Sequence, residues 1–188
     1  MSFKRDLRIQ VDTLGRLGSA SDERLRDVLT AGAVEGRDKA RVRIGGIVNL
    51  SSAYIGNDLR STPAVQTRTT VEARISATRR GVLLTRYPHS VLRVANRSKP
   101  GTHPAGVAGS IVPGRTYKQP KFFLVPKLRG SGATGVAYRT GRARNDFVVT
   151  RGPSVSQAFR LVRDDVAGEL QEQMAAQRLQ ELDELVTQ

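Results

Sequence analysis

After a short alternating start, the hydrophobic period of this sequence changes from helical to alternating and then back to helical. The last segment shows a helical period most clearly, because apolar residues recur there every three or four positions: Val155, Phe159, Val162, Val166, Leu170 and Met174. This spacing predicts an amphipathic helix. Ser154 and Gln157 have the spacing of a capping box, which places the start of the helix at residue 154. Three leucines extend the pattern after an expected break or drift near Gln177: Leu179, Leu182 and Leu185.

The centre of the chain follows a period of two. In TTVEARISA (69–77), Val71, Ala73, Ile75 and Ala77 face one way and polar residues face the other, which predicts a half-buried strand. Six short runs of strand character follow: GVLLTRY, SVLRVAN, GSIV, KFFLV, GVAYRTG and DFVVT. Short strands separated by Gly- and Pro-rich connections favour an antiparallel sheet, sandwich or small barrel. The Pro- and Gly-rich stretch 96–109 is expected to be a long exposed loop.

The N-terminal segment begins with a short alternating strand around Leu7, Ile9 and Val11. A helix over about 19–50 follows, with Ser19 or Ser21 as its cap. Its four glycines either mark close approach to a neighbouring element or break the helix. A turn and one short helix are expected over 50–63. The predicted fold class is therefore α+β, with a long N-terminal helix, a β-rich centre over 68–150 and a long C-terminal helix.

The stretch GSGATG (130–135) matches the G-x-G-x-x-G spacing of a dinucleotide-binding loop. Such a loop must follow a strand and open a helix, so that the pyrophosphate meets the helix N-terminus. Here the glycines follow KFFLVP and lead into GVAYRTG, another strand-like run, and no acidic residue stands about 20 positions on. The sequence therefore predicts a β-hairpin loop in which glycine supplies positive φ, and no nucleotide cofactor.

The residue types that carry most catalysis and metal binding are sparse. The chain has no cysteine, which excludes disulfides and thiolate sites and fits a protein made in the cytosol. His89 and His103 have no carboxylate at ligand spacing, so no metal is expected. No serine has a convincing His and Asp partner, and no enzyme activity is predicted. No apolar run approaches the roughly 18 residues that cross a bilayer, and MSFKRDLRIQ lacks the apolar region of a signal peptide.

Charge is distributed unevenly along the chain. Lys and Arg number 31 against 17 acidic residues, yet residues 154–188 carry a net −4 and residues 1–153 a net +18. The division predicts a basic body (1–153) and an acidic amphipathic helix (154–188) packed on that body or on a neighbouring subunit. A basic body attracts phosphate or acidic protein surfaces. A coding bias towards arginine would also produce this imbalance, and so would selection for head-to-tail pairing of copies.

Two groups of residues are candidates for binding. Five arginines near turns are predicted to face DNA or an acidic partner: Arg79, Arg80, Arg97, Arg142 and Arg144. Seven residues of the C-terminal helix are predicted to form a subunit interface: Phe159, Val162, Asp164, Asp165, Val166, Glu169 and Leu170. TYKQPKFF (116–123) interleaves aromatic and basic residues as a single-strand stacking platform does, although its phenylalanines are expected to fill a strand face.

The order of these pieces resembles the minor tail protein Z family of tailed phages, the neck or tail-completion proteins of lambda-like siphophages. The resemblance covers residues 68–180 and rests on LLTRY (83–87), GSIVPGRTYKQPKFFLVPKLRGSGATGVAYRTG and RGPSVSQAFRLVRDDVAGELQEQM. In that family a phenylalanine-containing strand (here 119–125) leads to a hairpin and an arginine-containing strand (here 137–140). A Gly152-Pro153-Ser154 step then begins a helix with an early phenylalanine, here Phe159. The family's Pro-Ile step is replaced here by Asn145-Asp146-Phe147.

The resemblance implies a structural virion protein at the head-proximal end of a tail, made in the host bacterial cytoplasm. Such a protein completes the tail and helps to join it to the head, as part of a ring around the DNA path. Its implied partners are other copies of itself (a hexamer is the expected ring), the tail terminator, head-closure or connector proteins and the tail tube. Genomic DNA is a further, non-specific partner, and no membrane is involved. The alternative from composition alone is a non-catalytic, basic nucleic-acid-binding module.

Overall fold

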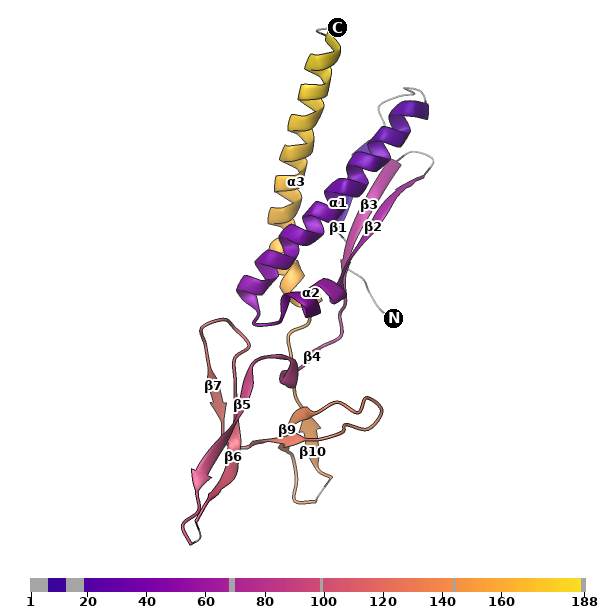
Figure 1. Cartoon of the computed structure of the whole chain (residues 1–188). Helices are drawn as coiled ribbons and strands as arrows, with labels where there is room; N and C mark the ends of the chain where they lie inside the picture. The colour runs from indigo at the N-terminus through magenta and orange to yellow at the C-terminus, as the bar shows by residue number, and fades with distance from the viewer. Residues whose placement is uncertain (1–6, 13–18, 68–69, 99, 144, 187–188) are drawn as a thin grey trace. The chain divides into compact units, whose positions relative to one another are not determined.

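The protein has an α+β fold with long helices near both ends and several small antiparallel sheets between them (Figure 1). This computed structural model describes residues 7–12, 19–67, 70–98, 100–143 and 145–186, with side chains from residue 23 to residue 177. The chain forms two compact units. The helical unit consists of Met1–Ile44, Ser52–Arg79 and Val155–Gln188, and the β unit consists of Gly45–Ser51 and Arg80–Ser154.

The helical unit contains a three-stranded antiparallel sheet in the order β1-β3-β2. Its strands are β1 (Leu7–Asp12), β2 (Leu59–Gln66) and β3 (Thr70–Ala77). The alternation predicted for β3 is confirmed, since its apolar residues are buried and its polar residues are partly exposed. β2 was expected to be part of a turn, and that expectation is wrong. Pro63 lies in a bulge between Thr62 and Val65. Proline has no backbone N–H, and at a bulge this removes no hydrogen bond between the paired strands.

Three helices are present in the part of the chain that the structure describes. They are α1 (Ser19–Ile47), α2 (Ser52–Asp58) and α3 (Val155–Val186). α3 begins directly after Ser154, as predicted, but the expected break near Gln177 is absent from its backbone. α1 also runs through its four glycines without a break. Apolar side chains of α1, β3 and α3 form the core of the unit, including Leu29, Ala40, Ile44, Val71, Ile75, Phe159, Val166 and Leu170.

The β unit contains three small antiparallel sheets. The first has the order β5-β6-β7, from β5 (His89–Ala95), β6 (Thr102–Gly109) and β7 (Tyr117–Gln119). The second has the order β10-β9-β8, from β8 (Phe122–Val125), β9 (Gly135–Arg139) and β10 (Phe147–Val149). The third pairs β4 (Val82–Leu83) with β11 (Arg151–Gly152), and the 3-10 turn η1 (Leu84–Arg86) follows β4.

Two expectations for the β unit are wrong. The expected loop over 96–109 is largely strand β6, which pairs with β5 along its length, and the chain turns only at residues 96–101. The run GSIV is not a strand, because β6 ends at Gly109 and the chain then bends. GVLLTRY gives only the two-residue strand β4 before η1. Pro and Gly residues suggested a loop, but Pro104 and Gly106 lie at a register irregularity, where a strand tolerates both.

Tyr87 joins the beginning of the β unit to its end. Its side chain is buried, and its hydroxyl donates a hydrogen bond of 2.8 Å to the carbonyl oxygen of Pro153. A Cβ atom on Gly152 would lie 2.7 Å from Tyr87 Cε2, so only glycine leaves room for the ring. The Gly152-Pro153 step is therefore part of the packing around Tyr87 in the β unit.

Candidate functional site

The glycine-rich stretch GSGATG lies in the loop of a β-hairpin, as predicted. It connects β8 to β9, which pair antiparallel, and no helix follows it. Gly130 and Gly132 have φ values of 89° and 63°, which glycine adopts without strain. The loop is closed by hydrogen bonds from the Leu128 N–H to the Ala133 carbonyl and from the Gly132 N–H to the Leu128 carbonyl. These backbone groups hydrogen-bond to each other, as in an ordinary hairpin turn.

Charge is segregated between the two units. The β unit contains 14 of the 31 Lys and Arg residues but one of the 17 acidic residues, a formal charge of +13. The helical unit holds the other 17 basic and 16 acidic residues, a charge of +1. A coding bias towards arginine would add basic residues to both units, but it would not remove the acidic residues from one of them. The β unit is therefore the part of the chain to search for an anionic ligand.

A groove of about 670 Å³ lies on the β unit, and we call it the bulge groove. Its lining includes Val91, Arg93, Pro104, Gly106, Lys121, Phe122, Phe123, Leu124 and Arg139. These residues come from β5, β6, β8 and β9 and from the segment just before β8. The groove thus joins an apolar floor to three cationic side chains.

A β-bulge builds the floor of this groove. The register of β5 against β6 shifts between Leu92 and Arg93, which leaves Ala105 as an extra residue opposite β5. Gly106 has a φ of 137°, and a Cβ there would lie 2.5 Å from the Gln119 carbonyl oxygen. Only glycine permits both the backbone conformation and the close approach of the chain at 119–120. Bulges of this kind bend a strand and change the direction of nearby side chains.

The three cations of the bulge groove have few anionic neighbours. Neither Arg93 nor Lys121 forms an ion pair with another described residue, and no described residue that lines the groove carries a carboxylate. Arg139 lies over the Phe123 ring at 5.6 Å and donates a hydrogen bond of 3.2 Å to the Ala143 carbonyl. Asp146 is the one acidic residue of the unit, and its Oδ2 accepts a hydrogen bond of 3.1 Å from the Ala143 N–H.

The arginines predicted from the sequence occupy exposed positions near these elements. Arg97 lies in the turn between β5 and β6, and Arg142 lies in the turn between β9 and β10. Arg79 and Arg80 are exposed at the point where the chain passes from one unit to the other, and Arg144 lies outside the described residues. Sequence reasoning missed Arg93 and Arg139 as binding residues, because it sought cations near turns and these two belong to strands. It considered Lys121 only as part of TYKQPKFF (116–123), whose phenylalanines it expected to fill a strand face.

The aromatic residues near the groove pack mainly against each other. Phe122 stacks on Tyr138 with ring centroids 5.6 Å apart, and Phe123 meets Phe147 edge-on at 6.0 Å. Phe122 and Phe123 are both half-buried. Tyr117, from the same TYKQPKFF segment, is 45% exposed. The phenylalanines therefore support the sheet of β8, β9 and β10 and present only part of their rings to a ligand.

The residues predicted to form a subunit interface on α3 fall into two groups. The apolar ones belong to the core of the helical unit, where Phe159, Val162, Val166 and Leu170 are at most 5% exposed. The acidic ones have arginine partners in the same unit: Asp164 accepts a hydrogen bond of 2.9 Å from Arg163, while Asp165 and Glu169 both pair with Arg43 of α1. The apolar group thus belongs to the core of the unit, whereas Asp164 and Asp165 remain 80% and 74% exposed beside their arginine partners.

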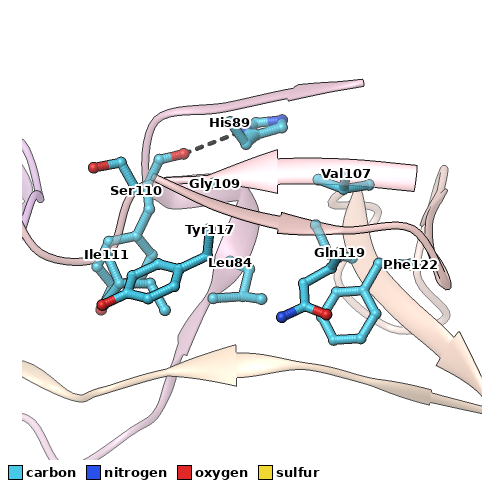
Figure 2. A pocket seen from close by; sticks show the side chains of 11 residues that line it. Leu84, His89, Val107, Gly109, Ser110, Ile111, Tyr117, Gln119 and Phe122 are labelled. Atoms are coloured by element: carbon cyan, nitrogen blue, oxygen red, sulfur yellow. Dashed lines mark hydrogen bonds between the residues drawn. The ribbon is translucent and has the colours of Figure 1, made fainter. Parts of the chain in front are cut away.

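The β unit also has an apolar cavity of about 290 Å³ (Figure 2). Figure 2 shows Tyr117 beside Leu84 and Ile111, with Phe122 next to Gln119. His89 lines the same cavity, and its Nδ1 lies 3.0 Å from the Tyr87 carbonyl oxygen. No carboxylate stands among the described lining residues, so His89 lacks the partner that a catalytic base ordinarily has. The cavity offers apolar packing and no evident acid–base pair.

Metal and membrane sites are not evident in the part of the chain that the structure describes. No three His, Asp or Glu side chains are grouped there as ligands of a metal ion. None of the described helices is long and apolar enough to span a membrane. Comparison with protein-family models, with curated proteins and with solved structures gives no significant match.

Proposed function

We propose that this chain is a non-catalytic structural protein of a phage virion, located at the head-proximal end of the tail. There it completes the tail and helps to join it to the head, as part of a ring of identical subunits around the DNA path. The tail terminator, the head-closure or connector proteins and the tail tube are its proposed neighbours. The proposal takes its specific form from the resemblance of residues 68–180 to the minor tail protein Z family.

The observation that carries the proposal is the charge segregation between the two units. A nearly neutral helical unit suits contacts with other proteins, whereas a β unit with a charge of +13 suits sequence-independent contacts with phosphate. A ring subunit on a DNA path needs both kinds of surface. The apolar cavity with its single histidine offers no chemistry that would favour an enzyme instead.

The first experiment measures the mass of the purified protein in solution, alone and with isolated tails that lack it. We expect the protein to bind to one end of the tails, and electron microscopy of the complex should show the added density there. A monomer that ignores tails but binds duplex DNA with a steep salt dependence would overturn the proposal.

That second outcome corresponds to the alternative function, a basic nucleic-acid-binding module. The single acidic residue in the β unit favours it as well. The two functions differ in the partner that the helical unit needs, because only the tail protein requires contacts between subunits. Binding to tails therefore separates them, and DNA binding alone does not.

A further inference from the structure

We propose that the bulge groove is a binding site for the phosphodiester backbone of a nucleic acid, with Arg93, Lys121 and Arg139 as its phosphate ligands. The inference does not depend on the tail function, because the groove belongs to one unit of a single chain. It defines a binding site on the strands of the β unit, whereas the sequence analysis proposed arginines near turns as the binding residues.

The first argument is the electrostatics of the groove. Three cations line one depression in a unit whose single carboxylate already accepts a hydrogen bond from a backbone N–H. Arg93 and Lys121 form no ion pair with a described residue, and an anionic ligand would supply the charge that balances theirs. Arginine also presents a planar fork of N–H donors that matches the geometry of phosphate.

The second argument is the continuation of positive charge beyond the groove. Arg97 follows Arg93 by four residues towards the tip of the β5–β6 hairpin, a reach of at most about 14 Å. Arg142 follows Arg139 by three residues, and the Arg139 side chain bonds to Ala143 in that same turn. Two further arginines therefore lie within four residues of groove cations along the chain. Additional cations near the groove suit a linear polyanion better than a single small anion.

The third argument concerns the floor and the competing occupant. Val91, Phe122 and Leu124 offer apolar surface against which sugars and base faces can pack.

The acidic face of α3 from a second copy is the other candidate for a cationic groove. Asp164, Asp165 and Glu169 of that face already have arginine partners in their own unit, which partly neutralise its charge. The observations favour the nucleic acid.

The test compares two charge-matched triple variants of the full chain. The first replaces the groove cations (Arg93→Gln, Lys121→Gln, Arg139→Gln). The control removes the same charge from three exposed cations of the same unit outside the groove (Arg115→Gln, Lys127→Gln, Arg129→Gln). Binding of a fluorescent strand of about 20 nucleotides, and of a duplex of the same length, is measured from about 50 to about 200 mM salt. Circular dichroism and thermal melting check that each variant is folded.

We expect the groove variant to lose about 100-fold in affinity for the single strand at about 0.1 M salt, and its log–log salt slope to fall by about two units. Both values follow from three lost phosphate contacts at about 0.7 counterions each. The control should lose less than about tenfold. The double variant Arg93→Gln, Lys121→Gln, which keeps the packing of Arg139, should show an intermediate loss. If the groove and control variants lose affinity equally, binding follows net charge and the proposal is wrong.

Two further arms identify the ligand. An oligonucleotide with an uncharged methylphosphonate backbone should not compete, whereas both the duplex and the single strand should, and their ratio shows which form the groove prefers. A glutamate peptide of equal charge should bind at least about tenfold more weakly than the oligonucleotide. If that peptide binds as tightly as the oligonucleotide and depends on the groove residues, the site belongs to an acidic protein and the proposal is overturned. Failure to bind tails would count against the proposed function and would not alter this result.

Discussion

Gly36 is a point of close approach between α1 and its neighbours in the helical unit. A Cβ atom there would lie 2.5 Å from Leu170 Cδ1 of α3 and 3.0 Å from Ile75 Cδ1 of β3. We expect Gly36→Ala to destabilise the protein by about 1–3 kcal/mol, because the added methyl overpacks the core. Gly45→Ala is the matched control in the same helix. Nothing lies within 4 Å of its Cβ position, so it should stabilise the protein by about 0.5–1 kcal/mol through helix propensity. Urea unfolding of the two variants measures the difference, and equal effects would contradict this account.

The glycines of α1 show the limit of sequence reasoning at this scale. The sequence allowed either a close approach or a break in the helix at each glycine, and the structure shows what each position does. Gly36 marks a close approach, a Cβ at Gly32 would lie at an ordinary 3.7 Å from Met174 Sδ, and Gly45 and Gly46 are open. The sequence alone could not distinguish these positions, because the space at each depends on which residue of another element lies opposite.

Glu35 connects helices α1 and α3 through a small polar network. Lys39 Nζ lies 3.0 Å from one carboxylate oxygen, and Gln173 Nε2 donates a hydrogen bond of 3.0 Å to the other. The hydrogen bond from Lys39 lowers the pKa of Glu35 below its ordinary value of 4.5; partial burial opposes this shift, and the Gln173 hydrogen bond adds to it. A lowered pKa in the folded state means that the carboxylate contributes stability above pH 4.5. That contribution is lost as the pH falls through the folded-state pKa.

We therefore expect Glu35→Gln to reduce the free energy of unfolding at about pH 7 by less than about 1 kcal/mol, since the side chain is 43% exposed and solvent screens the pair. The difference from the wild-type protein should shrink as the pH falls below 4.5. Urea unfolding at a series of pH values measures it, with the exposed Glu172→Gln as a control that should have little effect near neutral pH. A difference that persists in acid would show that the carboxylate acts through packing and not through its charge.

Elements with a clean period were predictable from the sequence, and strands that contain proline were not. The alternation of β3 and the three-to-four spacing at the start of α3 each depend on one face that meets the core, and both were confirmed. β2 and β6 were missed because Pro63, Pro104 and Gly106 resemble loop residues. In each strand the irregular residues lie at a bulge, whose position depends on the partner strand and is not encoded locally.

The β unit is largely an insertion between two segments of the helical unit. Residues 80–154 leave β3 and return at α3, and the N–H of Ser156 donates a hydrogen bond of 3.2 Å to the carbonyl oxygen of Thr78. The two ends of the insertion therefore lie side by side within the helical unit. Surface sites of this kind tolerate the exchange of one domain for a short loop.

Replacing residues 80–154 with a short Gly/Ser linker should leave a folded helical unit whose net charge falls from +14 to +1. We expect strong helical circular dichroism, a cooperative thermal transition and no nucleic-acid binding at physiological salt. Melting curves and the binding assay used for the bulge groove measure these outcomes. A chain without a cooperative transition would show that the helical unit needs the β unit in order to fold.

The candidate site was only partly predictable at the scale of the whole molecule. The excess of positive charge was evident from composition. Dividing the sequence at residue 153, however, hid the fact that the β unit carries +13 and the helical unit +1. The helical unit takes residues from both ends of the chain, so the acidic α3 and the mixed charges of α1 together make it nearly neutral. The bulge groove could not be foreseen, because β5, β6, β8 and β9 meet only after their sheets have formed.

The insertion also determines the order in which the two units can fold during translation. Residues 80–154 are synthesised before α3, so the β unit can close while the helical unit still lacks its last element. At about 5–20 residues per second, the 32 residues of α3 take roughly 2–6 s to be made. During that interval α1 lacks the packing of Leu170 of α3 next to Gly36, and nascent chains are open to aggregation. A premature stop codon before residue 155 would therefore release a product with a complete cationic unit and an apolar face that nothing in the chain can bury.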